Sequence, residues 1–143
     1  MMKVKEIMSS PVETLDRNDT LSLAEDLMTM KRIRHLPVLE EGLLAGIVTQ
    51  RDLFHAGLST AMGFGSKAQK EFMRTVLVKE VMTEAVISIP PEAEVAEAAR
   101  LMLEKKIGCL PVVSKGQLVG MISESDLVRL VARGKALSHT PAQ

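Results

Sequence analysis

The sequence is poor in residues on which several classes of protein depend. Its 143 residues include one cysteine, three phenylalanines and no tryptophan or tyrosine. The single cysteine, Cys109, excludes an intrachain disulfide and a cysteine-based metal cluster, and it agrees with a reducing compartment. With so few aromatic rings, stacking on bases cannot be the main mode of recognition.

Neither sign of charge dominates, and long apolar runs are lacking. Lysine and arginine together number 18, as do aspartate and glutamate. Such a balance gives no field that would attract a polyanion, so nucleic acid is not expected as a main partner. The apolar runs are far shorter than the ~20 residues that span a bilayer, and the first six residues lack the apolar stretch of a signal peptide. We therefore expect a cytoplasmic protein that does not insert into membranes.

One sequence pattern occurs twice in the chain. Leu-Pro-Val occurs at 36–38 and again at 110–112, and in both copies a glycine follows eight residues after the valine. Sliding the chain by 74 residues aligns 4–53 with 78–127 without a gap and matches 18 of 50 positions. Chance does not produce such a run, so one supersecondary unit has been duplicated. A unit that cannot bury its apolar face alone normally packs against its copy.

Each copy shows the same order of expected elements. A short strand near 12–15, or 86–89, precedes a segment with apolar residues at helical spacing, which is 20–32 in the first copy. Two short apolar runs separated by a turn then predict a hairpin, and a final helix starts after Thr49 or Ser123. The expected fold class is α/β (α+β), with two β-α-β-β-α motifs.

The predicted organisation assigns 4–60 to the first motif, 61–77 to a linker with a short helix, 78–134 to the second motif and 135–143 to a disordered tail. Residues 54–77 have no counterpart in the other copy. The helix expected within this insertion carries Lys67, Lys70 and Arg74 on one stripe. This stripe fits a connector helix with a solvated basic face; the alternative is a lid that faces phosphate, or a partner surface.

Each hairpin ends in a hydroxyl residue that is followed three positions later by an aspartate, as Thr49–Asp52 and Ser123–Asp126. The first N–H groups of a helix lack internal partners and carry partial positive charge, which favours an anion such as phosphate. An acidic residue nearby can accept hydrogen bonds from both hydroxyls of a ribose. One short motif could therefore hold sugar and phosphate together.

The same spacing also fits a purely structural capping box, in which the hydroxyl and the carboxylate close the start of a helix. Both interpretations stay open. Two copies of the motif, each set behind Leu-Pro-Val and a glycine-ended hairpin, make the binding interpretation much more specific.

Catalysis and metal binding are not indicated. The sequence around His35 shows no evident carboxylate or nucleophile that would make it a general base, and His55 and His139 are isolated, without metal-ligand spacing. Cys109 lies at the entrance to an apolar strand, which favours a small packing residue over a redox switch. A hydrolase or transferase acting on a bound nucleotide therefore has no supporting residues.

The chain resembles the paired cystathionine β-synthase domain, or CBS pair, also called a Bateman module. The resemblance spans roughly 4–132 and is carried by Val-Lys-Glu-Ile-Met-Ser at 4–9, Arg-His-Leu-Pro-Val at 34–38 and Gly-Ile-Val-Thr-Gln-Arg-Asp-Leu at 46–53, with second copies from 78, 108 and 120. It implies two motifs related by pseudo-two-fold symmetry and packed into one module. It also implies clefts between the motifs that bind AMP, ADP, ATP or S-adenosylmethionine, and a homodimer.

Carried over by position, the resemblance implies that Asp52 and Asp126 bind ribose, with Thr49 and Ser123 near the ribose and phosphate. Each cleft mixes the copies, so that Ser123 and Asp126 would face Val12 and Glu13, and Thr49 and Asp52 would face Val86 and Ile87. The full set of expected ligand-binding residues is Val12, Glu13, Arg34, His35, Thr49, Arg51, Asp52, Val86, Ile87, Cys109, Ser123 and Asp126. The adenosyl compound would be a ligand, and no covalent cofactor is expected.

The copies differ where charge would matter. Arg34 and His35 lie where the family often places residues that contact phosphate, but the second copy has Gly108 and Cys109. Arg51 likewise has only Ser125 opposite it. The two clefts are therefore not expected to share a ligand or an affinity.

The leading hypothesis is a stand-alone regulatory module that binds an adenosine-containing ligand and is not an enzyme. Sensing requires a ligand with different affinities for two states of the protein. The alternative is a ligand-free dimerisation or interaction module that regulates a partner enzyme or transporter.

Overall fold

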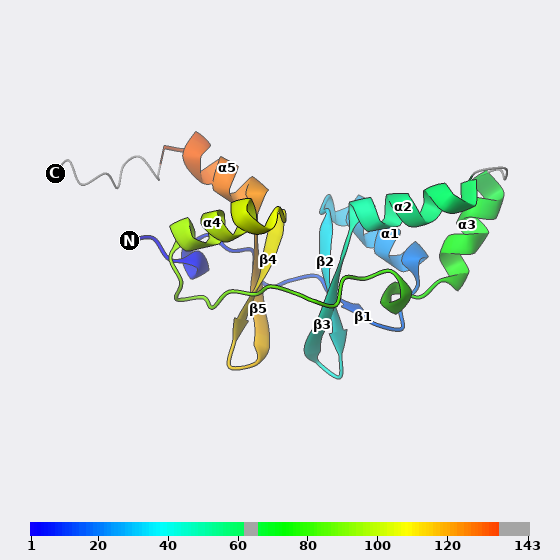
Figure 1. Cartoon of the computed structure of the whole chain (residues 1–143), viewed down its shortest axis with the longest axis horizontal. Helices are drawn as coiled ribbons and strands as arrows, with labels where there is room; N and C mark the ends of the chain where they lie inside the picture. The colour runs from blue at the N-terminus through cyan, green and yellow to red at the C-terminus, as the bar shows by residue number, and fades with distance from the viewer. Residues whose placement is uncertain (62–65, 135–143) are drawn as a thin grey trace. The chain divides into compact units, whose positions relative to one another are not determined.

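The computed structural model describes the backbone of residues 1–61 and 66–134, and the side chains of this range apart from 58–61 and Ser66. The tail expected at 135–143 and His139 lie outside the described residues. The regular elements are β1 (Leu15–Asp16), α1 (Leu21–Lys31), β2 (His35–Glu40), β3 (Leu43–Thr49), α2 (Gln50–Ala61), α3 (Ser66–Thr75), α4 (Val95–Lys105), β4 (Cys109–Ser114), β5 (Gln117–Ser123) and α5 (Glu124–Ala132). Single 3-10 turns, η1 (Val4–Glu6) and η2 (Val78–Glu80), open the two copies of the repeat (Figure 1).

The described chain forms two compact units that do not coincide with the repeats of the sequence. The first-repeat unit is Glu13–Val86, and the second-repeat unit joins Met1–Val12 to the chain from Ile87 onwards. Figure 1 shows the blue N-terminal segment beside α4, which belongs to the other end of the sequence. The leading segment of each copy therefore packs with the body of the other copy.

Backbone hydrogen bonds hold each leading segment in its unit. Val4 N donates to the carbonyl of Ala93 at 2.8 Å, and Val95 N donates to the carbonyl of Met2 at 2.9 Å. In the first-repeat unit, Val78 N donates to the carbonyl of Asp19 at 2.7 Å. Because these donors would otherwise be buried without partners, the bonds fix which segment covers which core.

The first-repeat unit contains a three-stranded sheet in the order β1-β2-β3. The hairpin β2–β3 is antiparallel, and β1 runs parallel to β2 with Leu15 opposite Val38. The first strand is shorter than the expected 12–15 and starts at Leu15, the first residue of this segment that is buried. In the second-repeat unit the equivalent pairing is a single bridge between Ile89 and Val112 beside the hairpin β4–β5.

The hairpin turns explain a glycine in each copy. Glu41 and Gly42 have φ angles of 51° and 81°, and Lys115 and Gly116 have 52° and 80°. Two consecutive positive φ angles define the type I′ turn, whose twist matches that of the flanking strands. Glycine at the second turn position adopts this conformation without a steric penalty.

The first helix of each unit ends in the same way, but α1 has a side-chain cap at its start and α4 has none. Thr20 caps α1, because its hydroxyl accepts a hydrogen bond from Leu23 N at 3.2 Å. Arg32 and its equivalent Lys106 adopt the left-handed conformation and donate their backbone N–H to the last turn of their helices. The chain then turns directly into β2 or β4.

Each unit has its own apolar core. The first core contains Leu21, Ala24 and Met28 of α1 with residues of β2 and β3, and it also contains Val78. The second contains Ala98 and Met102 of α4 with β4 and β5, and also Val4. The mixed α and β fold expected from the sequence is confirmed.

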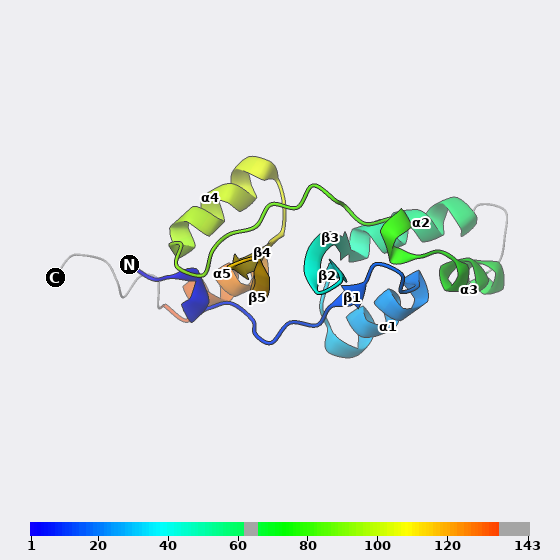
Figure 2. The same ribbon diagram turned by 90° about the horizontal axis from the view of Figure 1, so that it is seen from below.

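The insertion forms α3, which lies within the range where the sequence predicts a helix. Figure 2 shows α3 alongside α2 and α1, and Met73 is buried against their core. A side chain at Gly57 of α2 would collide with Gln69 of α3, so the glycine permits the close approach of the two helices. Lys67, Lys70 and Arg74 are exposed, which fits both a solvated basic face and a partner surface.

Candidate functional site

Thr49 and Asp52 join the end of β3 to the first turn of α2. Thr49 N donates to Asp52 Oδ2 at 2.8 Å, and Asp52 N donates to Thr49 Oγ1 at 3.1 Å. This reciprocal pair is a capping box. The structural interpretation of the motif is thus realised, and it fixes the Asp52 carboxylate at the N-terminus of α2.

Ser123 and Asp126 occupy the same place between β5 and α5, but their bonds differ. Ser123 N and Ser123 Oγ both donate to Asp126 Oδ2, at 2.9 and 3.2 Å. The other carboxylate oxygen, Oδ1, accepts a hydrogen bond from Arg129 Nη1 at 2.9 Å. Asp126 is only 9% exposed, and sequence reasoning did not single out Arg129. The only available signal was the spacing of three residues within one helix.

A leading segment lies against the strand that ends at each motif. Thr83 and Ile47 exchange backbone hydrogen bonds of 2.8 and 3.0 Å, two residues before Thr49. Ser9 and Met121 do the same two residues before Ser123, at 2.8 and 3.0 Å. In each unit, therefore, the strand that ends in a hydroxyl-x-x-Asp motif is also paired with a leading segment.

The glycine after each Leu-Pro-Val makes this approach possible. A Cβ atom at Gly46 would lie 2.8 Å from the carbonyl oxygen of Thr83 and 2.7 Å from Met82 Sδ. At Gly120 it would collide with the side chain of Met8. At Gly46 the close backbone approach favours glycine, whereas at Gly120 the nearest atoms belong to the flexible Met8 side chain. Met82 and Met8 pack against the apolar cores.

The structure groups the expected adenine-facing residues as follows. Val86 lies in the same unit as Thr49 and Asp52, and Val12 lies in the same unit as Ser123 and Asp126.

The other two expected adenine-facing residues, Glu13 and Ile87, each belong to the other unit, because the unit boundaries fall directly before them. Glu13 belongs to the first-repeat unit, where its carboxylate lies 3.5 Å from Lys31 Nζ. Ile87 belongs to the second-repeat unit and packs against its core.

The basic residues expected near phosphate gather at one motif. His35 is the register partner of Thr49, and Gln50 N donates to the carbonyl of Arg34 at 2.8 Å. Arg34 and Arg51 are exposed, and Arg51 lies in the first turn of α2. The N-terminus of α2 therefore has two arginines in its immediate sequence surroundings.

The second motif has no such charge in the equivalent places. The carbonyl of Gly108 accepts from Glu124 N at 3.0 Å, and Cys109 is the register partner of Ser123. Burial, and to a lesser extent the negative charge of Glu124, raise the pKa of the Cys109 thiol to about 12. The thiol is therefore neutral at physiological pH, as expected for a packing residue.

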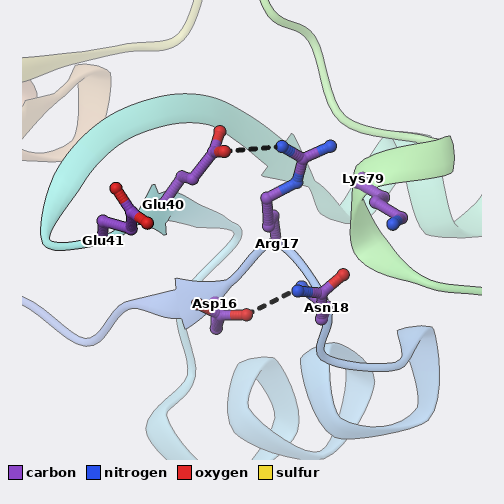
Figure 3. A pocket seen from close by; sticks show the side chains of 6 residues that line it. All are labelled: Asp16, Arg17, Asn18, Glu40, Glu41 and Lys79. Carbon is purple, nitrogen blue, oxygen red and sulfur yellow. Dashed lines mark hydrogen bonds and ion pairs between the residues drawn. The ribbon is translucent and has the colours of Figure 1, made fainter.

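A polar pocket lies elsewhere on the first-repeat unit, lined by Asp16, Arg17, Asn18, Glu40, Glu41 and Lys79 (Figure 3). Arg17 Nη1 lies 2.8 Å from Glu40 Oε2, and Asn18 N donates to Asp16 Oδ2 at 2.9 Å. None of these residues belongs to the set expected from the sequence. Among the described residues, Arg17 Nε is buried without a hydrogen-bond partner.

Within residues 1–61 and 66–134, no group of three histidine, cysteine, aspartate or glutamate side chains could hold a metal ion. Within the same ranges, no helix combines the length and apolar character needed to cross a membrane.

The CBS domain family model matches residues 4–59 and 78–133, which together are most of the chain. The chain belongs to the CBS domain family. It is also similar to the crystal structure of a putative acetoin utilization protein, AcuB, from Vibrio cholerae, at 39% identity and a TM-score of 0.79 with 96% of both chains covered. The tandem CBS pair predicted from the doubled motif is thus confirmed.

Two similar CBS structures contain adenosine compounds. The CBS domain pair of protein MJ0100, in complex with 5′-methylthioadenosine and S-adenosylmethionine, has 27% identity and a TM-score of 0.76, covering 93% of this chain and 98% of that one. CBSX2 in complex with AMP has 26% identity and a TM-score of 0.76, covering 94% and 99%. CBS pairs similar to this chain therefore bind adenosyl ligands.

Proposed function

We propose that the protein is a regulatory module that binds an adenosine-containing ligand and does not itself catalyse a reaction. The observation that carries this proposal is the position of Asp52, whose carboxylate is held in the first turn of α2. Arg51 lies in the same turn, and the carbonyl of Arg34 accepts a hydrogen bond from Gln50 N. The ligands of the similar CBS structures support it. The cytoplasmic location stays a prediction.

The chemistry assigns one part of the ligand to each group. The Asp52 carboxylate accepts hydrogen bonds from the ribose hydroxyls, and the N–H groups of the first turn of α2 attract phosphate. Arg34 and Arg51 add positive charge there, and the imidazole of His35 can donate a hydrogen bond. The backbone and side chain of Val86 would supply hydrogen bonds and apolar contacts to the adenine, and Val12 would take that role beside Ser123–Asp126.

A test is thermal unfolding with AMP, ADP, ATP, S-adenosylmethionine and 5′-methylthioadenosine, with GMP as the control for the base. A ligand present at 100 times its dissociation constant adds about 2.7 kcal/mol to the free energy of unfolding. We expect at least one adenosine compound to raise the melting temperature and GMP to have a smaller effect. If all five leave the melting temperature unchanged up to millimolar concentration, the proposal is wrong.

A second candidate function is a ligand-free dimerisation or interaction module. Phe54 of α2 and Val128 of α5 occupy equivalent positions and are 65% and 67% exposed. Large apolar side chains that recur at an exposed position can form an interface. A homodimer is compatible with both candidate functions. Light scattering of the purified protein would detect a dimer. If Phe54 and Val128 form the interface, Phe54→Glu and Val128→Glu should give monomers.

A further inference from the structure

The two ribose-binding candidates differ in how many hydrogen bonds their carboxylates already accept. Among the described residues, Asp52 accepts one, from Thr49 N. Asp126 accepts three, of which two come from Ser123 and one from Arg129. The hydroxyl-x-x-Asp motifs are equivalent in sequence, but the bond from Arg129 comes from a residue outside the motif.

The difference decides what each carboxylate can still bind. An ionised carboxylate offers about four lone-pair positions to donors. The two hydroxyls of a ribose need two of them. Asp52 retains about three free positions, whereas Asp126 retains about one, so a ribose diol can bind Asp126 only if an existing donor leaves.

Arg129 is the donor that can leave. Ser123 N belongs to the backbone that starts α5, whereas the Arg129 side chain is 51% exposed and reaches Asp126 from the next turn of the same helix. Asp126 is 9% exposed, but water competes for the charge of the half-exposed Arg129 side chain and so weakens this ion pair. Ligand binding at Asp126 is therefore weakened rather than abolished.

The first-repeat unit lacks this arrangement. The residue equivalent to Arg129 is His55, whose ring meets that of Phe54 edge to face with centroids 6.1 Å apart. In the part of the chain that the structure describes, Asp52 has no ion pair. Oδ1 of the Asp52 carboxylate therefore stays available to a ligand.

We propose that Arg129 is a specificity-determining residue that occupies the Asp126 carboxylate, so that the Thr49–Asp52 site fills with an adenosine ligand first. The Ser123–Asp126 site fills only at higher concentration, when the ligand displaces Arg129. This inference rests on the proposed function and adds an order of filling to it. It also gives the module two ligand thresholds instead of one.

The test is calorimetric titration of the full chain with AMP. Wild-type protein should show a tight and a weak site; Asp52→Asn should remove the tight site and Asp126→Asn the weak one. Arg129→Met keeps the length of the side chain but removes its donors, and it should tighten the weak site about tenfold, which corresponds to about 1.4 kcal/mol. Arg133→Met removes an exposed arginine near the end of the same helix and should change neither affinity.

The outcomes separate this inference from the function on which it rests. If AMP binds but Arg129→Met leaves the weak affinity within twofold of wild type, the role of Arg129 is refuted and the binding function stands. A tight site that disappears in Asp126→Asn instead of Asp52→Asn refutes it as well. If neither wild type nor Arg129→Met binds AMP, ATP or S-adenosylmethionine, both proposals fall. Circular dichroism of each variant checks that a lost site does not reflect unfolding.

Discussion

Val4 and Val78 are equivalent residues of the two sequence repeats, and each is fully buried in the core of the unit built mainly by the other repeat. The leading segments are thus exchanged. Because they also lie on the strands that lead to Thr49 and Ser123, the exchange places an extended segment beside each candidate site.

The exchange of the leading segments predicts which unit loses stability when a cavity is made in each segment. Val4→Ala should lower the free energy of unfolding by about 2 kcal/mol, from lost apolar burial and the cavity left behind. Hydrogen exchange should then speed up in β4 and β5 rather than in β2 and β3. Val78→Ala should give the reverse pattern and serves as the matched control. Faster exchange of β2–β3 in Val4→Ala would show that the segments are not exchanged.

The glycines after Leu-Pro-Val should differ in their tolerance of alanine. At Gly46 the added methyl group meets the backbone carbonyl of Thr83, which cannot move without breaking its hydrogen bond to Ile47 N. At Gly120 it meets chiefly the flexible side chain of Met8. We expect Gly46→Ala to destabilise by about 2–3 kcal/mol and Gly120→Ala by about 1 kcal/mol in urea unfolding. Equal costs would contradict this explanation.

Arginine variants test the difference in charge between the sites. If Arg34 and Arg51 contact phosphate, Arg34→Ala and Arg51→Ala should each weaken ATP binding about fivefold while changing adenosine binding little, since adenosine has no phosphate. Arg100→Ala, which removes an exposed arginine from α4, is the control of equal charge. An equal loss for ATP and adenosine would mean that the arginines act on the fold instead.

Cys109 gives a prediction that does not depend on any ligand. Its folded pKa of about 12 lies above the ordinary value of 9.0, so the unfolded chain releases the thiol proton first as the pH rises. The stability that Cys109 contributes is therefore complete below pH 9 and is lost between about 9 and 12.

Because Cys109 is the only cysteine, one reagent reports on it alone. At pH 8 we expect slow reaction with a thiol reagent in the folded protein and fast reaction in urea. Cys109→Ala should flatten the fall in stability between pH 9 and 12. Fast labelling of the folded protein would contradict the burial of this thiol.

The sequence by itself determined the repeated elements, because their signals are local. Helical spacing, Leu-Pro-Val and the turn glycines each act over a few residues, and they predicted the hairpins and the position of Thr49–Asp52 and Ser123–Asp126. The shorter first strand escaped prediction because its pairing with β2 depends on a partner distant in sequence.

Only the tertiary structure decided which core each leading segment completes and how each carboxylate is used. The sequence Val-Lys-Glu is identical at 4–6 and 78–80, so these residues alone do not show whether a leading segment packs on its own repeat or on the other one. The same holds for the two aspartates, whose motifs match while their hydrogen bonds differ. Burial and hydrogen bonding are settled by residues far apart in the chain or by side-chain conformation, and a pattern of residue types contains neither.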